Sequence, residues 1–264
     1  MTPQYRIAAA DIASGLSAWD MWGRLGWREN KRRYRRTVIG PFWSTLSLAV
    51  FVIVLGVVWS RLWQQDPKDY MPYLTSGMVV WLLLSVTISE SCIAFINLET
   101  LIKQVRVSYT LLACAVVWRN VIVFFHNILI FLLVAIYASV AVNAATLLVG
   151  PGLLLFCANA VWVVLLLGIA CVRYRDIQQL VTTLLQVSMF VTPVFWQPAQ
   201  LGGDLQFVVQ FNPLYHFIEI VRAPLLCRIA TAETWFVVAG MAVAGWAVVF
   251  FLFSRFRRRI PYWL

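Results

Sequence analysis

Residues 42–62 read FWSTLSLAVFVIVLGVVWSRL, and this stretch decides the class of fold. It is apolar almost throughout, and its one charged side chain, Arg61, lies beside its end. A helix that crosses a bilayer needs about 20 consecutive, mainly apolar residues. The whole chain of 264 residues is 62% hydrophobic and 12% charged, whereas soluble domains carry about 25% charged residues. The sequence therefore predicts a protein for which lipid is part of the solvent.

Five further segments have the length and composition of membrane spans, which gives six in all. The first span follows Gly40-Pro41, a pair that is typical of a helix start. The pattern predicts an all-α membrane protein with its transmembrane domain over residues 42–254. The six predicted spans are residues 42–62, 73–96, 116–140, 147–172, 177–196 and 234–253.

A seventh apolar stretch, residues 205–226, is too interrupted to cross lipid as one helix. Asn212-Pro213 and Pro224 break it, and three polar side chains, His216, Glu219 and Arg222, lie within it. Irregular backbone at membrane depth must be shielded by protein. We therefore expect short re-entrant helices on the extracytoplasmic side before the last span, within a gate segment over about residues 199–230.

Lysine and arginine predict the orientation, because they gather in the cytoplasmic loops of membrane proteins. With six spans, 17 of the 21 basic residues fall on one side of the membrane and four on the other. Both termini are therefore expected in the cytoplasm. A cytoplasmic segment over residues 1–41 precedes the spans, and a basic tail over residues 255–264 follows them. The four residues on the far side are Arg61, Lys68, Arg222 and Arg228.

Residues 11–31 have the pattern of an amphipathic helix that lies on the membrane surface. Ile12, Leu16, Trp19 and Gly23 recur at helical spacing, and polar or basic residues recur on the opposite face. Such a helix serves either as a membrane anchor or as a docking surface for a cytoplasmic partner.

Two opposite charges are expected at similar depth in the membrane. Glu90 lies near the cytoplasmic end of the second span, and Arg119 lies near the start of the third. Charges at this depth are costly and are usually paired or functional. A structural ion pair is the favoured interpretation, since the spans contain no chain of further acids for a proton relay.

The sequence also excludes several classes of function. The formal net charge of +10 occurs in short blocks beside apolar stretches, which favours membrane lipids over nucleic acid. The five cysteines have no CxxC spacing, and we expect no metal site. The chain contains no P-loop, GxSxG or HExxH motif, so we expect a transporter rather than an enzyme.

Several stretches together resemble the membrane subunits of ABC-2-type polysaccharide exporters, the permeases for O-antigen, capsule and teichoic-acid chains. The resemblance spans nearly the whole chain and is nearest to the O-antigen branch. One departure is that Lys103-Gln104-Val105-Arg106 is followed by Val107-Ser108 rather than by Leu-Pro or Phe-Pro. The stretches that carry the resemblance are RRYRRTVIGPFW (32–43), VWRN (117–120), FHN (125–127), RYRDI (173–177), TPVFW (192–196) and NPLYHFIEIVRAP (212–224).

The resemblance implies a homodimer in a bacterial inner membrane, bound to two copies of a separate P-loop ATPase. The ATPase would bind ATP and magnesium, and this chain would bind no cofactor. The pair of permeases would export a lipid-linked polysaccharide of the lipopolysaccharide type through a channel at their interface. Contact with the ATPase is expected over residues 97–112 and along the N-terminal helix, with Glu99, Lys103, Arg106 and Arg28 as the coupling residues.

Two sets of residues are expected to contact the cargo. Cationic clusters suit phosphate, so the basic run after the N-terminal helix is a candidate for the lipid pyrophosphate, unless it only obeys the positive-inside rule. Aromatic rings stack on sugar faces, so aromatic residues of the gate segment are candidates for the conduit. The pyrophosphate set is Lys31, Arg32, Arg33, Arg35 and Arg36, and the conduit set is Phe195, Trp196, Tyr215, His216 and Phe217.

Three alternatives stay open at the level of sequence. An ABC-2 permease for a drug or a lipid would have the same fold. An ATP-independent secondary flippase would work without an ATPase but would usually carry more intramembrane acids. A structural membrane scaffold is disfavoured by the gate segment.

Overall fold

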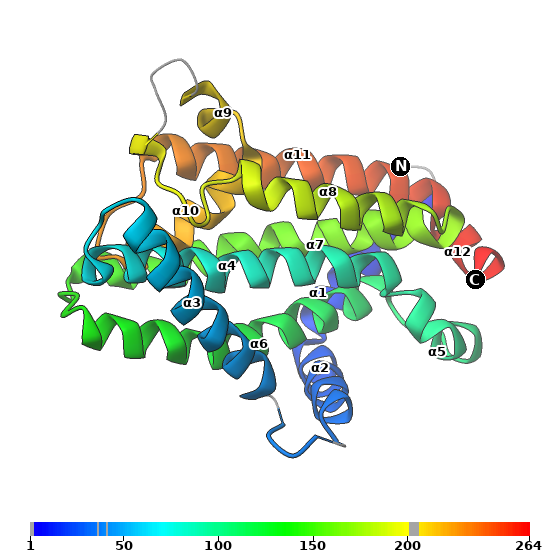
Figure 1. Cartoon of the computed structure of the whole chain (residues 1–264). Helices are drawn as coiled ribbons and strands as arrows, with labels where there is room; N and C mark the ends of the chain where they lie inside the picture. The colour runs from blue at the N-terminus through cyan, green and yellow to red at the C-terminus, as the bar shows by residue number, and fades with distance from the viewer. Residues whose placement is uncertain (1–2, 36, 41, 201–205) are drawn as a thin grey trace.

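The structure is a computed structural model and describes residues 3–35, 37–40, 42–200 and 206–264. These residues form helices and connecting turns, and none of them lies in a strand (Figure 1). The expected all-α class is therefore confirmed. The α-helices are α1 (Pro3–Ser17), α2 (Trp19–Arg33), α3 (Phe42–Leu62), α4 (Pro67–Ile93), α5 (Glu99–Gln104), α6 (Tyr109–Tyr137), α7 (Val149–Arg173), α8 (Ile177–Val191), α9 (Gln206–Gln210), α10 (Pro213–Leu225), α11 (Ala232–Phe256) and α12 (Ile260–Trp263).

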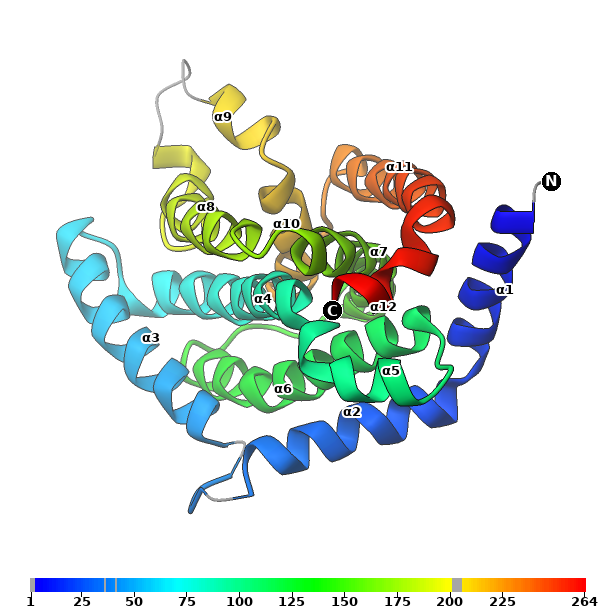
Figure 2. The same cartoon turned by 90° about the vertical axis from the view of Figure 1, so that its right-hand side faces the viewer.

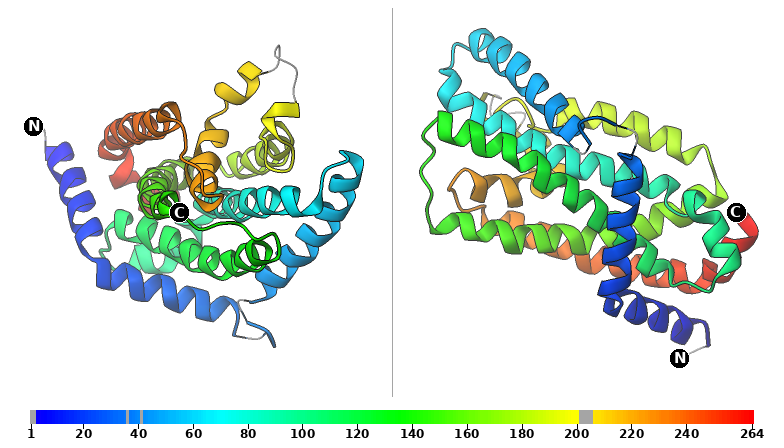
Figure 3. Two further views of the ribbon diagram at one scale, coloured as in Figure 1. Left: turned by 90° about the vertical axis from the view of Figure 1, so that its left-hand side faces the viewer. Right: turned by 90° about the horizontal axis from the view of Figure 1, so that it is seen from below.

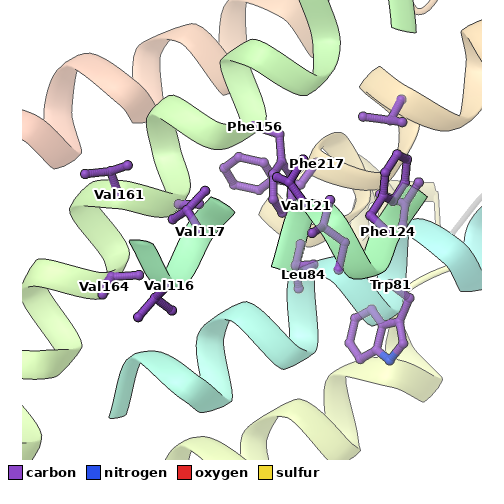
Figure 4. Packing of buried hydrophobic residues seen from close by; sticks show 14 of the residues in the cluster. Trp81, Leu84, Val116, Val117, Val121, Phe124, Phe156, Val161, Val164 and Phe217 are labelled. Atoms are coloured by element: carbon purple, nitrogen blue, oxygen red, sulfur yellow. The ribbon is translucent and has the colours of Figure 1, made fainter. Parts of the chain in front are cut away.

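Helix α4 forms the centre of the bundle. It packs against α3, α6, α7, α8 and α10. In its apolar window 67% of the residues are buried, against 22% in that of α3, so α3 lies at the periphery. Figure 4 shows the packing of the core, where Trp81 and Leu84 of α4 lie near Phe124 of α6 and Phe217 of α10.

The bundle has two chemically different ends. At one end lie α5, α12 and the C-terminus, and at the other lies the connection between α6 and α7 (Figures 1 and 3). The first end carries the basic residues of α2, α5 and the turn Arg257–Arg259 (η5), and we call it the basic end. The opposite end is called the far end.

Within the described part of the chain, five helices are long and apolar enough to cross a membrane. They are α3, α4, α6, α7 together with the preceding turn Ala144–Leu148 (η2), and α11 with the turns that follow it. Helix α8 occupies the predicted fifth span but has only 15 residues and ends at Val191 instead of Trp196. Thr192 is extended because a residue before proline is disfavoured in the helical conformation. The count of six spans stays a prediction.

The gate segment contains two short helices, α9 and α10, within its described residues. Asn212 caps α10 by accepting hydrogen bonds from the backbone N–H groups of Leu214 and Tyr215, and Pro213 occupies the first helical position. Whether these helices dip into a membrane stays a prediction, and residues 201–205 lie outside the described part of the chain.

The N-terminal segment departs from the prediction in one way. The expected single helix over residues 11–31 is wrong, because the chain breaks at Ala18 into α1 and α2, which wrap around the basic end of the bundle (Figures 2 and 3). Leu16 and Trp19 of the expected apolar face are 46% and 71% exposed, so they remain available to a membrane surface. The buried face instead carries Gly15 and Gly26, where a Cβ would come within 2.8 Å of α6 or the residue before it, so small residues permit this contact.

Candidate functional site

Helix α5 is a short exposed helix between two long apolar ones, at the basic end (Figure 1). Lys103 Nζ lies 2.6 Å from Glu99 Oε1, and this hydrogen bond and the charge of Lys103 lower the pKa of Glu99 below its ordinary value. Lys103 and the three residues that follow it are exposed. Three of the four expected coupling residues, Glu99, Lys103 and Arg106, thus share one projecting element.

A buried carboxylate fixes the point where the chain returns from α5 into α6. Asp11 Oδ2 accepts hydrogen bonds from Arg257 Nε at 2.8 Å and Nη2 at 2.6 Å. Its Oδ1 accepts from Ser108 Oγ at 2.8 Å, Thr110 N at 3.2 Å and Thr110 Oγ1 at 3.1 Å. Because Ser108 is the N-cap of α6, the Asp11 clamp joins α1, the start of α6 and the turn after α11. Sequence reasoning did not identify Asp11.

Four alternating charges fix the other end of the α5 segment, near the end of α4. Arg119 Nη2 lies 2.6 Å from Glu90 Oε2, so the structure brings the expected pair together. Arg119 Nη1 also pairs with Glu29, and Arg33 pairs with the second oxygen of Glu90. Burial opposes the charge of Arg33, but the hydrogen bond and charge of Glu90 outweigh this and raise the pKa of Arg33. This charge network ties α2 to α4 and α6.

A basic hollow of about 790 Å³ opens between α2, the turn after it and α6. Three residues of the expected pyrophosphate set line it, whereas Arg33 points to Glu90 and Arg36 lies outside the described residues. Arg28, which was expected to couple to the ATPase, lines this hollow as well. No carboxylate occurs among its described lining residues, which include Arg28, Lys31, Arg32, Tyr34, Arg35, Gly40 and His126.

A buried guanidinium anchors the gate segment at the far end. Arg222 is 1% exposed and donates two hydrogen bonds to Glu219 Oε2, at 2.8 and 2.6 Å. It donates a third to the Pro193 carbonyl at 2.6 Å, and its guanidinium lies 4.3 Å from the centre of the Tyr73 ring. The Tyr73 hydroxyl donates to the carbonyls of Pro193 and Trp196. These contacts join α10 and the turn after α8 to the central helix α4.

The expected conduit residues are mostly enclosed within this single chain. Phe195, His216 and Phe217 are each at most 8% exposed, whereas Trp196 and Tyr215 are half-buried. The ring nitrogens of His216 lie within hydrogen-bonding distance of a hydroxyl of α11 and a carbonyl of α9. Trp196 and Tyr215 are therefore the members of the set that can reach a ligand in this conformation.

A polar side chain that sequence reasoning missed lies at membrane depth beside α3 and α8. Asn120 is 2% exposed, and neither polar atom of its amide has a hydrogen-bond partner among the described residues. It lines an otherwise mainly apolar cavity of about 390 Å³ between α3, α4, α6 and α8, together with Trp81, Phe51 and Asn127. A buried amide without a partner is unusual and requires an explanation.

Among the described residues, no group of three or more histidine, cysteine, aspartate or glutamate side chains is arranged to hold a metal ion.

Comparison with known proteins agrees with this arrangement of helices. The family model described as "ABC-2 type transporter" matches residues 22–226, which is most of the chain. A protein of Myxococcus xanthus named "O-antigen export system permease protein RfbA" is 22% identical over 219 residues, which cover 82% of this chain and 84% of that protein. The chain therefore belongs to the ABC-2 type transporter family and is the membrane subunit of a transporter.

Proposed function

We propose that this chain is the permease of an ATP-driven exporter that moves a lipid-linked polysaccharide out of the cytoplasm. Two copies would form the channel, and two copies of a separate P-loop ATPase would supply the energy. The basic end would face the cytoplasm of a bacterial inner membrane, because 17 of the 21 basic residues fall on that side. This count takes α8, extended by the turn after it, as a sixth span.

The observation that carries this proposal is the attachment of α5. The segment between α4 and α6 projects at the basic end, and each of its ends is fixed to the N-terminal helices, one by the charge network and the other by the Asp11 clamp. A short helix held this rigidly can transmit a push from an ATPase into two long helices. An ordinary connecting loop would not need buried charges at both ends.

The basic hollow supports a phosphate-bearing cargo. Four cationic side chains surround space for an anion, namely Arg28, Lys31, Arg32 and Arg35. One guanidinium group can donate hydrogen bonds to two oxygens of a phosphate at once. The hollow extends from the turn after α2 to His126 of α6. The pyrophosphate of a lipid carrier in the inner leaflet would lie within it. The polysaccharide itself is proposed from the likeness to the O-antigen export permease.

The proposed channel lies between α3 and α8 of the two copies. Helix α8 has no buried residue among those described, and α3 exposes most of its apolar side chains, so both helices offer surface to a second copy. The cavity that contains Asn120 opens between them. The unpartnered amide is enclosed in this conformation, so it would meet sugar hydroxyls only when the channel opens.

Co-purification of the chain with its ATPase tests the proposed partner. The tagged chain, extracted in mild detergent, should retain a P-loop ATPase, and Lys103→Glu/Arg106→Glu should weaken this binding at least tenfold. The matched control, Arg61→Glu/Lys68→Glu, reverses two exposed charges at the far end and should leave binding unchanged. Normal membrane insertion without any retained ATPase would contradict the proposal.

The basic hollow has its own test. Arg32→Gln/Arg35→Gln should abolish binding of a polyprenyl-pyrophosphate-linked glycan and leave ATPase retention intact. The control Arg175→Gln/Arg258→Gln removes two exposed guanidinium groups outside the hollow and should bind the glycan normally. Equal loss in both variants would mean that general basicity, not the hollow, recruits the cargo.

A further inference from the structure

A second hollow lies at the basic end, and it shares no lining residue with the basic hollow. It lies between α7, α8, α11 and α12 and has a volume of about 480 Å³. Its walls are aliphatic and aromatic, with Leu166 and Ile169 of α7 facing Leu252 of α11. Figure 2 shows α7 between α8 and α11.

Three arginines line this hollow. Arg173, Arg255 and Arg259 form no ion pair with any described residue, and no carboxylate occurs among the described lining residues. The Arg173 guanidinium lies 4.9 Å from the centre of the Trp263 ring and 5.1 Å from that of Tyr174. These ring contacts hold one cation in place, as cation–π contacts do.

Apolar side chains of α7 also line another hollow, nearer the middle of the bundle. This smaller hollow of about 180 Å³, lined almost entirely by apolar atoms, lies between α4, α7, α10 and α11. Residues of α7 that line the two hollows share one face of the helix, because they are spaced four, three and seven residues apart. They are Phe156, Ala160 and Val163 in the smaller hollow and Ala170 in the larger one. From Phe156 to Ala170 this face runs for about 20 Å, against about 15 Å for half of a bilayer's hydrocarbon core.

We propose that this arginine-rimmed groove binds one anionic phospholipid of the cytoplasmic leaflet. The phosphate would lie among the three guanidinium groups, and an acyl chain would follow the apolar face of α7. Basic pockets between membrane helices on the cytoplasmic side recognise anionic headgroups in this way. A zwitterionic lipid fits less well, since its headgroup amine would meet three cations and no carboxylate. The inference depends on the proposed orientation only for the choice of leaflet.

The test titrates dioleoylphosphatidylglycerol into the purified chain in phosphatidylcholine nanodiscs and counts bound lipids by native mass spectrometry. One tightly bound phosphatidylglycerol is expected per chain. Arg255→Gln/Arg259→Gln should weaken its binding about 30-fold, because each arginine near an anionic lipid surface contributes about 1 kcal/mol and 1.4 kcal/mol is a factor of ten. The matched control Arg175→Gln/Arg258→Gln removes equal charge outside the groove and should change binding less than threefold.

A second variant tests the apolar half of the groove without any change of charge. Ala170→Phe places a ring in the hollow and should reduce binding of phosphatidylglycerol about tenfold. Equal weakening by the two arginine pairs, or equal binding of phosphatidylcholine and phosphatidylglycerol, would overturn the proposal. The assay contains neither cargo nor ATPase, so its result is independent of whether the chain exports polysaccharide.

Discussion

Replacing Asp11 with alanine removes the carboxylate that joins α1 to the start of α6 and to the turn after α11. The Asp11 side chain is 1% exposed and accepts five hydrogen bonds, two of them from Arg257. Removing one partner of a buried ion pair costs about 3–5 kcal/mol. Because the Arg257 side chain is 27% exposed, water can accept part of the hydrogen bonding that its guanidinium group loses when Asp11 is removed. We therefore expect Asp11→Ala to lower the free energy of unfolding by about 4 kcal/mol.

Two milder changes should give a graded series. Asp11→Asn keeps an oxygen that can accept from Ser108 and Thr110 but loses the charge, so about 2 kcal/mol is expected. Arg257→Gln leaves the carboxylate with its three other donors and should cost a similar amount. The control Asp20→Asn removes an exposed pair with Arg24 and should cost less than about 1 kcal/mol.

Thermal unfolding in nanodiscs and hydrogen exchange measure these effects. At about 2–4 °C per kcal/mol, Asp11→Ala should lower Tm by about 10 °C. Backbone amides over residues 105–112 should exchange faster, because the N-terminal turn of α6 loses its anchor, whereas residues 138–148 at the far end should be unaffected. A Tm within 1 °C of that of the unaltered protein, with unchanged exchange over residues 105–112, would refute the clamp.

Three other predictions follow from single contacts. Glu90→Gln leaves Arg33 and Arg119 without their shared carboxylate, so the free energy of unfolding should fall by about 2–3 kcal/mol, measured by thermal unfolding. A loss below about 0.5 kcal/mol would contradict the charge network. Asn120→Leu removes an unpartnered buried amide, so it should raise the free energy of unfolding by about 1 kcal/mol. The same variant should reduce export in a complementation assay, and unchanged export would contradict a role in the channel. Gly77→Ala places a Cβ 2.7 Å from the Val194 carbonyl oxygen and should lower the free energy of unfolding by about 1–3 kcal/mol. The control Gly240→Ala adds a Cβ with no neighbouring atom of another element within 4 Å, so it should be neutral or stabilising by up to about 1 kcal/mol. Equal effects of the two variants would argue against close packing of the gate turn on α4.

The long spans could be predicted from sequence because the bilayer sets a length that composition must match. The end of α8 could also have been predicted, since Thr192-Pro193 is a signal for leaving the helix. The early start of α6 has a similar local cause, namely the Ser108 cap. In each case the determining residues lie within a few positions of the element that they define.

The remaining features depend on contacts between distant parts of the chain. The break at Ala18 has no proline or glycine beside it, and it occurs where α1 and α2 each follow a different part of α6. Asp11 meets a partner 246 residues away, so no local pattern reveals it. The separation of Arg33 from its basic neighbours follows from the fold as well, because only the position of Glu90 turns it away from the hollow.

Reconstituted transport tests the central claim most directly. The chain and its ATPase are placed in proteoliposomes with a polyprenyl-pyrophosphate-linked polysaccharide, and the glycan is measured when it becomes available to an impermeant glycosidase on the opposite side. We predict transfer that requires ATP, magnesium and the ATPase, and that is lost in Lys103→Glu/Arg106→Glu. Transfer without the ATPase would contradict the claim in favour of a secondary flippase. ATP-dependent movement of free lipid or drug without any polysaccharide would contradict the proposed cargo.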